Sequence, residues 1–477
     1  MFQKKRTINV FMLAMINVAA LVNIANISVS AKYGFTSLFF IIVASLVFFI
    51  PIALISAELA TGWPQRGGVY IWVKEALGDN FGFLAIWLQW IENVIWYPTA
   101  LSFAAVSFAY IFNPSLAQNR TYVMSVIILV FWLSTFANFF GMTISGWISS
   151  VCAVFGTILP GAVIIILGAV WLILGNPSQI TFSVKSFFPD FTSLSQFALL
   201  SGVLMSLSGL EMSAVHAKEV KNPSKNYPLS IFLSAIIIIS IVSFGALAIA
   251  IVIPSKSIEL PAGAIEAMAT FFRFYNFPKL TSVIAFLITI GALGMISTWT
   301  IGPIKGMYAT AEHGDLPIFL QKLNKYQAPI NLLIVQAIIV TILTFVFLFT
   351  PTVSSSYWIL LNLTAHLYQI MYILMFISAI VLRYKKPKVE RAYKIPFKNI
   401  GMWIVASAGI IGTSLAIIIG YLPPPQIAGF NTLSYEIFLI GGTIVVCIIP
   451  FIIRRFRKPS WHLEHKKIKR ESTKSKL

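Results

Sequence analysis

Serine, glycine and glutamate residues interrupt an apolar run at a depth where a helix would cross a membrane. Ser206, Ser208 and Gly209 follow this run, and Glu211 then places a carboxylate before a basic, proline-punctuated loop that extends to Pro228. Backbone groups left unpaired in hydrocarbon are costly, and so are charges. We therefore expect the helix to break here, at a site that handles something other than lipid.

The first apolar segment is irregular in a similar way, because it carries Asn17, Asn23 and Asn26 among small and apolar residues. Interrupted helices at matching positions of two halves are typical of inverted-repeat transporters whose site lies near the middle of the membrane. Unwound backbone there can offer N–H groups to a carboxylate and C=O groups to an ammonium, which suits a zwitterionic amino acid. The alternative is that these polar residues are hydrogen-bonding contacts between spans.

Two carboxylates lie deep within apolar segments: Glu92, in the sequence WLQWIENVIWYP, and Glu211. Ionisable groups inside a membrane are functional by default, so either of them could couple or gate proton movement. The alternative for both is a structural role, as a protonated or helix-capping carboxyl. Glu58 falls at the end of the second apolar segment and is expected at the membrane interface.

Trp299 is distinguished from the other aromatic residues by its neighbours. Aromatic residues make up 14% of the chain, and most are expected to face lipid or to lie at the membrane interface. Trp299 follows a run of small residues and precedes Gly302 and Pro303, so we expect it to face a pathway through the protein. Tyr368 and Tyr372, one helical turn apart, are further candidates.

The composition predicts an all-α integral membrane protein. Of the 477 residues, 58% are hydrophobic and only 10% are charged, with a mean hydropathy of +0.87, which excludes an ordinary soluble domain. Apolar runs repeatedly reach the roughly 20 residues that cross a bilayer. Twelve transmembrane helices are predicted, at about 8–31, 37–60, 82–112, 121–138, 147–174, 196–217, 229–253, 280–311, 329–350, 356–383, 400–422 and 434–453. Cys152 and Cys447 fall within these spans and are expected to pack as small apolar residues.

The basic residues are distributed unequally between the two sides of the membrane. Lys and Arg number 34; six of them (Lys32, Arg120, Lys185, Lys256, Arg273 and Lys279) fall on one side and the other 28 on the side of the termini. The positive-inside rule therefore predicts that both termini are cytoplasmic. Basic loops facing anionic lipid also explain the net charge of +19, so nucleic acid is not expected as a partner.

The chain divides into five parts in this interpretation. They are a cytoplasmic N-terminal tail (1–7), a transport core of ten helices (8–383), a basic cytoplasmic loop (384–399), two further helices (400–453) and a basic cytoplasmic C-terminal tail (454–477). We expect this last tail to be solvated near lipid headgroups. The alternative is a pH-responsive gate, because His462 and His465 would titrate near neutrality.

Several long segments resemble the amino acid–polyamine–organocation superfamily of transporters. They are PQRGGVYIWVKEALGDNFGFLAIW (64–87), GLEMSAVHAKEVKNPSKNYP (209–228) and GPIKGMYATAEHGDLP (302–317). FFPDF (187–191) and VIPSKSIELPAGAIEAM (252–268) are similar to the bacterial glutamate/γ-aminobutyrate antiporter branch in particular. The resemblance runs from about residue 8 to residue 455, in the same order along the chain.

This resemblance implies a five-plus-five inverted repeat with broken helices 1 and 6, and amino-acid exchange across the bacterial inner membrane. Substrate would lie between spans 1, 6, 8 and 10. Carried over by matching motif, the substrate-binding residues would be Ala20, Leu21, Val22, Asn23, Ser206, Leu207, Ser208, Gly209, Trp299 and Tyr368. Glu211 lies within a carried-over segment, and both Glu211 and Glu92 are expected, from their depth in apolar segments, to serve coupling or gating.

The sequence also departs from that branch. Met295 and Asn26 stand where acidic residues are expected, and Ala20, Leu21 and Val22 replace a Gly-Ser-Gly turn. Span 5 has Ser149 and Ser150 in the region where some relatives use a lysine, and the C-terminal plug is shortened. These changes leave the fold and transport as expected, but they alter which substrate side chain would be tolerated, because specificity depends on satisfied polar groups.

The sequence therefore predicts an amino-acid antiporter that works by alternating access. The alternatives are a proton-coupled symporter or uniporter for amino acids or amines, and a sensor that binds without exchanging. No catalytic group, cofactor or metal site is expected, although Ser297 and Thr298 keep a sodium-coupled mechanism open. The expected partners are the amino-acid substrate and the lipid bilayer, and a homodimer is left open.

Overall fold

The computed structural model describes residues 8–64, 67–140, 154–192, 194–212, 220–326, 328–427 and 431–461. The expectations for both terminal tails, for Cys152 and for Ser149 and Ser150 therefore fall largely or wholly outside the described residues. Within these ranges the side chains of Ala20, Ser297 and Thr298 are also left out of the description.

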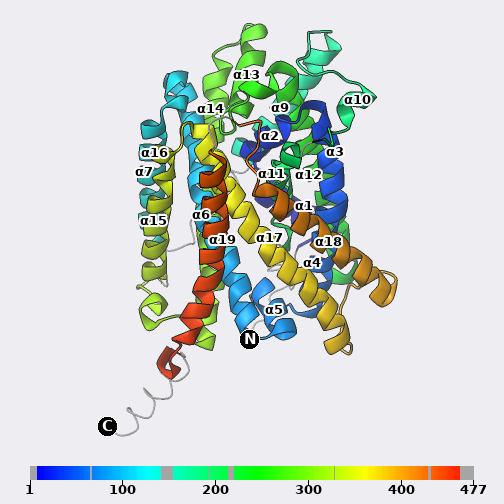
Figure 1. The fold of residues 1–477 in the computed structure, drawn as a ribbon, viewed down its shortest axis with the longest axis vertical. Coiled ribbons are helices and arrows are strands. Elements are labelled where there is room, and N and C mark those ends of the chain that lie inside the picture. The colour runs from blue at the N-terminus through cyan, green and yellow to red at the C-terminus, as the bar shows by residue number, and fades with distance from the viewer. Residues whose placement is uncertain are drawn as a thin grey trace.

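The described part of the chain is built from helices that stand side by side, with α17 and α18 inclined to the others (Figure 1). The helices are α1 (Val10–Leu21), α2 (Ile24–Ala31), α3 (Ser37–Ala44), α4 (Ile50–Gly62), α5 (Val69–Leu77), α6 (Asp79–Phe112), α7 (Arg120–Asn138), α9 (Leu159–Ile173), α10 (Val184–Phe187), α11 (Leu200–Met205), α12 (Pro223–Val252), α13 (Gly263–Phe274), α14 (Leu280–Ala309), α15 (Ile330–Thr344), α16 (Val346–Phe349), α17 (Val353–Lys385), α18 (Lys398–Gly420) and α19 (Thr432–Arg455). Short 3₁₀ and π-helical turns extend several of them.

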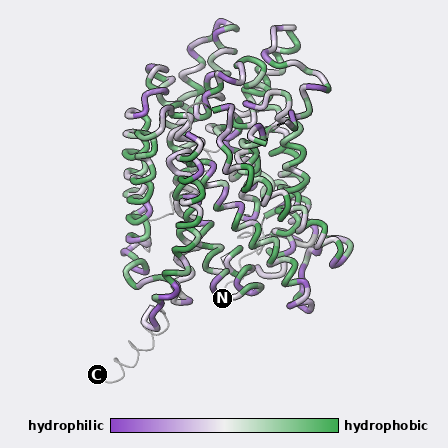
Figure 2. Tube along the Cα trace, viewed as in Figure 1, coloured by the Kyte–Doolittle hydropathy of each residue, from purple (hydrophilic) through white to green (hydrophobic). Residues whose placement is uncertain are grey.

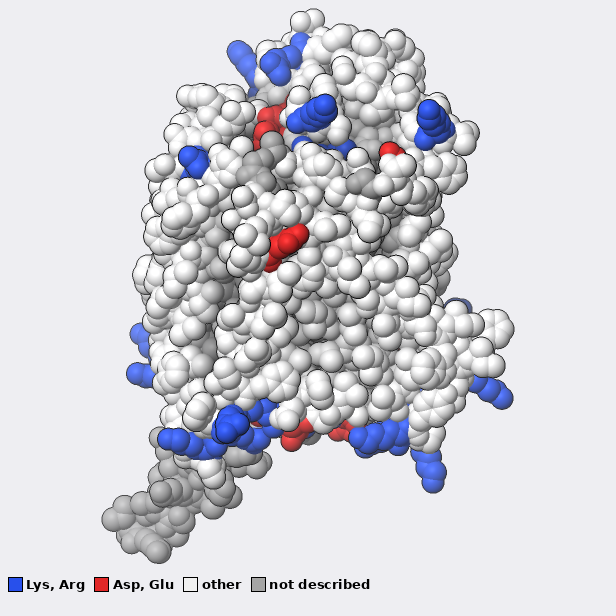
Figure 3. Space-filling view, in the orientation of Figure 1, with Lys and Arg blue, Asp and Glu red and all other residues white. Residues whose placement is uncertain are grey.

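Ten helical segments in the described residues are long and apolar enough to cross a membrane, by length and composition. Hydrophobic residues fill the middle of the molecule and hydrophilic ones gather toward its ends (Figure 2). In one face of the space-filling view, Lys and Arg side chains lie at the two ends, with a broad band almost free of them between (Figure 3). The all-α membrane class that the composition predicts is confirmed.

Helices α6 and α17 form the centre of the bundle, and α7, α18 and α19 lie at its periphery. In the most apolar stretch of each helix, 83% of residues are buried in α6 and 78% in α17, against 28% in α7 and in α18 and 17% in α19. Helix α6 packs along both α14 and α17. A central helix can therefore carry polar side chains that protein atoms surround, whereas the peripheral helices present apolar residues outward.

The first predicted span is two helices, because the chain is extended at Val22 and Asn23. Asn23 is the N-cap residue of α2, and its side chain accepts a hydrogen bond of 3.0 Å from the backbone N–H of Ala25. Asparagine is favoured at this position because it satisfies one of the N–H groups that a helix start leaves unpaired. The predicted break in the first span is therefore present, and its location follows from a local capping residue.

The helix α11 ends after Met205, as the serines and glycine of this segment predict. Gly209 adopts a φ of +113°, a left-handed conformation that glycine enters without the steric cost of a side chain. The hydroxyl groups of Ser206 and Ser208 donate to the carbonyl oxygens of Val203 and Leu204, at 2.6 and 3.0 Å. The hydroxyl of Ser206 thus satisfies a carbonyl that the end of the helix leaves open, and that of Ser208 adds a second donor to Leu204, which already accepts from the backbone N–H of Leu207.

The loop between α12 and α14 contains the helix α13, which the sequence interpretation did not predict. Helix α13 packs against α2, α9, α12 and α14. Its Glu266 receives a hydrogen bond of 3.2 Å from the hydroxyl of Tyr110 at the end of α6, and desolvation raises the pKa of this carboxyl to about 7. Helix α13 was missed because its 12 residues are too few to resemble a membrane span.

Glu58, near the end of α4, is buried within the protein. Only 1% of Glu58 is exposed, and Arg383 of α17 donates two hydrogen bonds to its carboxylate, at 2.6 and 2.5 Å. Arg391, in the loop after α17, approaches the same carboxylate to 3.5 Å, and the backbone N–H of Ile395 donates to it at 2.8 Å. The carboxylate thus joins α4 to α17 and to the loop before α18.

Two glycines allow α14 to approach the π-helical turn Val154–Ile158 before α9. A methyl group on Gly291 would lie 2.4 Å from the Cα of Gly156, and one on Gly156 would lie 2.1 Å from the Cα of Gly291. No side chain fits at either position, so the two backbones are in direct contact. Small residues permit such close helix packing in membranes, where dispersion replaces the hydrophobic effect between helices.

We expect Gly291→Ala to lower the free energy of unfolding by about 1–3 kcal/mol, because the methyl group must push two backbones apart. The matched control is Gly441→Ala in α19, where nothing lies within 4 Å of the added carbon. The melting temperatures of both variants in detergent micelles measure the difference. Equal melting temperatures for the two variants would contradict the direct contact.

Candidate functional site

A pocket lies where the two interrupted helices meet α6, α14 and α17. The residues that line it are Leu21, Asn23, Asn26, Glu92, Asn93, Trp96, Met205, Ser208, Met295, Trp299 and Tyr368. Segments that are far apart in the chain therefore contribute to one wall.

Six of the predicted site residues line this pocket directly: Leu21, Asn23, Ser208, Trp299, Tyr368 and Glu92. The other described ones shape its surroundings. Val22 is the extended residue between α1 and α2, and Leu207 is buried beside the end of α11. Ala20 belongs to the last turn of α1, and its side chain is outside the description.

Glu211 lies behind the pocket, where tyrosines from α17 surround its carboxylate. The hydroxyl of Tyr368 donates to Oε1 at 2.5 Å, and that of Tyr372 donates to Oε2 at 2.6 Å. Tyr372 also accepts a hydrogen bond of 2.7 Å from the backbone N–H of Gly209. Gln89 of α6 donates to Oε1 at 3.4 Å, and only 2% of Glu211 is exposed. The broken segment is thereby fixed to α17 through the carboxylate of Glu211 and through the backbone N–H of Gly209.

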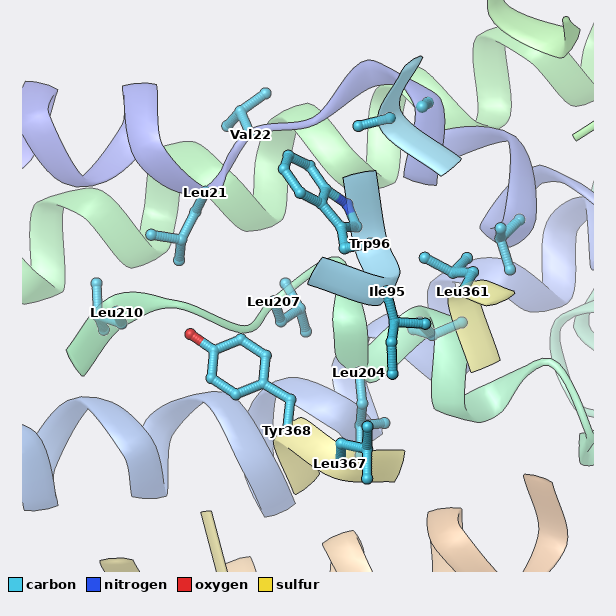
Figure 4. Close-up of a cluster of buried hydrophobic side chains, with 14 of the residues drawn as sticks. Leu21, Val22, Ile95, Trp96, Leu204, Leu207, Leu210, Leu361, Leu367 and Tyr368 are labelled. Atoms are coloured by element: carbon cyan, nitrogen blue, oxygen red, sulfur yellow. The ribbon is translucent and has the colours of Figure 1, made fainter. Parts of the chain in front are cut away.

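Tyr368 connects the Glu211 carboxylate with the pocket. Tyr368 and Tyr372 stack with their ring centroids 4.8 Å apart. Figure 4 shows the hydroxyl of Tyr368 turned toward the extended segment between Leu207 and Leu210, and the ring of Trp96 next to the segment that follows Val22. Tyr368 therefore belongs to both places: its ring borders the pocket and its hydroxyl holds Glu211.

Glu92 projects from the pocket-facing side of α6. Its neighbour Asn93 donates a short hydrogen bond to Oε1, and only 1% of Glu92 is exposed. Gln89 and Trp96 precede and follow Glu92 by about one turn, and residues at this spacing share a helix face. Glu92 and Glu211 are also near enough to interact electrostatically. The same face of α6 thus contributes to both the pocket and the Glu211 cluster.

The backbone carbonyl of Trp299 ties α14 to the neighbouring helix α6. Pro303 lies four residues later in α14 and has no N–H group, so the carbonyl of Trp299 lacks its usual intrahelical donor. The hydroxyl of Tyr97 in α6 supplies that hydrogen bond at 3.0 Å. The rings of Trp96 and Trp299 lie 6.2 Å apart in an edge-on arrangement. The proline next to Trp299 therefore creates an acceptor that ties α14 to α6.

Sequence reasoning missed Asn93, Trp96 and Met205 as pocket residues. The spacing of Trp96 from Glu92 on one helix could have identified it, because the two residues are four apart. Met295 and Asn26 were noted as departures from related sequences, and Asn26 also as a possible hydrogen-bonding contact between spans. In the structure Asn26 lines the pocket and accepts a hydrogen bond of 3.0 Å from the hydroxyl of Tyr357. Within the described ranges no group of three His, Cys, Asp or Glu residues could hold a metal ion.

Comparisons with known proteins agree with a membrane transporter. A family model described as amino acid permease matches residues 7–446. An uncharacterized transporter of Legionella pneumophila is 46% identical over 455 residues, covering 95% of this chain and 98% of that protein. A glutamate/γ-aminobutyrate antiporter of Lactococcus lactis is 34% identical, covering 89% of this chain and 85% of that protein.

A more distant relative is named for amines. A probable agmatine/putrescine antiporter of Lactococcus lactis is 25% identical over 435 residues, covering 89% of this chain and 90% of that protein. The match to the family model extends over most of the chain, from before α1 into α19. The chain therefore belongs to the amino acid permease family, within the amino acid–polyamine–organocation superfamily of multi-pass membrane transporters.

Proposed function

We propose that this protein is an amino-acid antiporter of the bacterial inner membrane, with both termini cytoplasmic. It exchanges a small amino acid for another amino acid or for a decarboxylated amine by alternating access. The observation that carries the proposal is the pocket at which the breaks after Leu21 and after Met205 meet Trp299 and Tyr368. The full architecture is then twelve spans, with a five-plus-five inverted repeat.

The two breaks supply the groups that a zwitterion needs. The start of α2 leaves backbone N–H groups without intrahelical acceptors, and one of them, that of Ala25, is capped by Asn23. The remaining N–H groups and the positive end of this helix suit an α-carboxylate. The carbonyl oxygens of Val203 and Met205 at the end of α11 each accept one described hydrogen bond within the protein, and the second lone pair of each suits an α-ammonium group. Both ends of the substrate backbone are then held by protein backbone rather than by charged side chains.

Trp299 would close the pocket against α6, because its ring lies beside Trp96 and its carbonyl is tied to Tyr97. In alternating access one half of such a protein moves relative to the other around a fixed site. The segment after Met205, which Glu211 holds to Tyr368 and Tyr372 of α17, would move relative to α14.

We expect Trp299→Ala to reduce exchange at least about tenfold, since the loss of an aromatic wall removes more than 1.4 kcal/mol of substrate contact. The measurement is counterflow of labelled amino acids in proteoliposomes. The control is Trp403→Ala in α18, where 49% of the tryptophan is exposed at the periphery. If Trp299→Ala lowered exchange only as much as it lowered folded yield, the residue would be structural.

A proton-coupled symporter or uniporter is the second candidate, and the buried carboxyls of Glu92 and Glu211 favour it. Such a protein would accumulate labelled substrate in proteoliposomes that contain no internal counter-substrate, whereas an antiporter would not. Binding without either activity would indicate a sensor instead. Absence of exchange for every amino acid, at any pH gradient, would overturn the antiport proposal.

A further inference from the structure

The pocket has an ionisable group of only one sign among its described lining residues. Glu92 contributes a carboxyl, and the described residues that surround the space include no Lys, Arg or His. The other polar contributors are the neutral side chains of Asn23, Asn26, Asn93 and Ser208, together with the ring of Tyr368. A cargo with an additional carboxylate beside Glu92 would face another acidic group and no basic side chain among the described lining residues.

The carboxyl of Glu92 is poorly compensated by what surrounds it. Its described hydrogen bond comes from the neutral amide of Asn93, and the nearby ionisable group, Glu211, is another acid. A carboxyl buried without a counter-ion either holds a proton or, when ionised, is strongly destabilising, and one neutral donor offsets only part of the cost of desolvating the ionised form. A positively charged cargo would supply the missing partner.

Two of the three asparagines that line the pocket already use their side-chain oxygens within the protein. The side-chain oxygen of Asn23 caps Ala25, and that of Asn26 accepts from Tyr357. Glu92 and Asn93 therefore offer side-chain oxygens to an N–H donor of the cargo, and of these two only Glu92 can carry a negative charge. Two tryptophan rings, Trp96 and Trp299, border the same space, and aromatic faces attract cations.

We propose that Glu92 binds a cationic amine of the cargo, so that the transported molecule carries an ammonium group at the end that lies against α6. This inference rests on the pocket being the cargo site of the proposed transporter and adds the class of the cargo. It favours a diamine or an amino acid with an amine at its far end over a dicarboxylic amino acid. Glu92 is then the specificity-determining residue.

The test compares wild type with Glu92→Gln, which keeps the shape of the side chain and its hydrogen bonding but removes the charge. Binding of putrescine, γ-aminobutyrate, alanine and glutamate to the full-length protein is measured by thermal shift over a range of concentrations, because a ligand stabilises the state it binds. Hydrogen bonds to charged groups are worth about 1.5–3 kcal/mol, so the apparent affinity of Glu92→Gln for putrescine and γ-aminobutyrate should fall roughly 10- to 100-fold. Affinity for alanine should change little.

Two further variants keep the test decisive. Glu92→Asp retains the charge on a shorter side chain, and should recover part of the amine binding if Glu92→Gln folds poorly. Glu436→Gln removes a carboxyl from the peripheral helix α19 and should leave all four affinities unchanged. The contrast between putrescine and γ-aminobutyrate shows whether the cargo is a diamine or an amino acid with a distal amine.

The outcomes separate this inference from the proposed function. Amine binding that depends on Glu92, in a protein that exchanges nothing, would support the inference and refute the antiporter. Exchange of alanine or glutamate in proteoliposomes, with amine binding unaffected by Glu92→Gln, would support the antiporter and overturn the inference. An equal loss of all four ligands in Glu92→Gln would also overturn it, since the residue would then only maintain the pocket.

Discussion

Replacing Arg383 by alanine is expected to lower the free energy of unfolding by about 3–5 kcal/mol, because it leaves a buried carboxylate without its main partner. The side chains of Arg383 and Glu58 are only 7% and 1% exposed, and two hydrogen bonds join them. Arg391 remains 3.5 Å from the carboxylate and places its own charge over the ring of Trp63, so it offsets part of the loss. The link between α4 and α17 should loosen first.

Denaturant or thermal unfolding of the purified protein in detergent measures this loss. The matched control is Lys386→Ala, which removes an ion pair with Glu75 whose members are 43% and 38% exposed. Exposed pairs contribute about 0–1 kcal/mol, so the control should unfold nearly as wild type does. A double replacement, Glu58→Gln with Arg383→Met, should recover part of the stability, because it removes both charges of the main pair. Arg391 then keeps the carbonyl oxygens of Leu382 and Lys386 and the ring of Trp63 as partners. Equal effects of Arg383→Ala and Lys386→Ala would refute the buried pair.

Tyr372→Phe is expected to destabilise the protein by about 2–4 kcal/mol and to reduce exchange at least about tenfold. The hydroxyl that it removes serves two buried groups at once, since it donates to Glu211 and accepts from the N–H of Gly209. The variant therefore releases both the carboxylate and the left-handed residue of the break. The segment after Met205 then loses its fixed position against α17, and with it the geometry of the pocket.

Comparison with Tyr368→Phe isolates the second role of Tyr372, which is to accept the hydrogen bond from Gly209. It removes one hydrogen bond to Oε1 of Glu211, where Gln89 still donates at 3.4 Å, and it leaves Gly209 paired with Tyr372. Its melting temperature should therefore lie between those of wild type and Tyr372→Phe, while its ring continues to border the pocket. If Tyr368→Phe proved the less stable variant, Tyr372 would not be the anchor of the break.

Local features of the chain were sufficient to predict its class and both interruptions. Apolar length and the scarcity of charge are properties of single segments, and they predicted a helical membrane protein. The breaks at Asn23 and Gly209 follow from a capping side chain and from a residue free to adopt positive φ, which act within a few positions of the chain. Trp299 and Tyr368 were identified as pathway residues from their small or periodic neighbours, and both line the pocket.

The partners of the buried carboxyls could not be predicted in the same way, because they come from distant helices. Glu58 pairs with an arginine 325 residues away, and Glu211 is held by tyrosines 157 and 161 residues away. Such pairings depend on the order, tilt and rotation with which helices pack, and hydropathy contains none of this information. Sequence therefore established the membrane class and the places where helices break. The packing of α4, α6 and α17 established that Glu58 forms a structural ion pair, that Glu211 anchors a break and that Glu92 faces the pocket. The reason is that burial and hydrogen-bond partners exist only once distant segments meet.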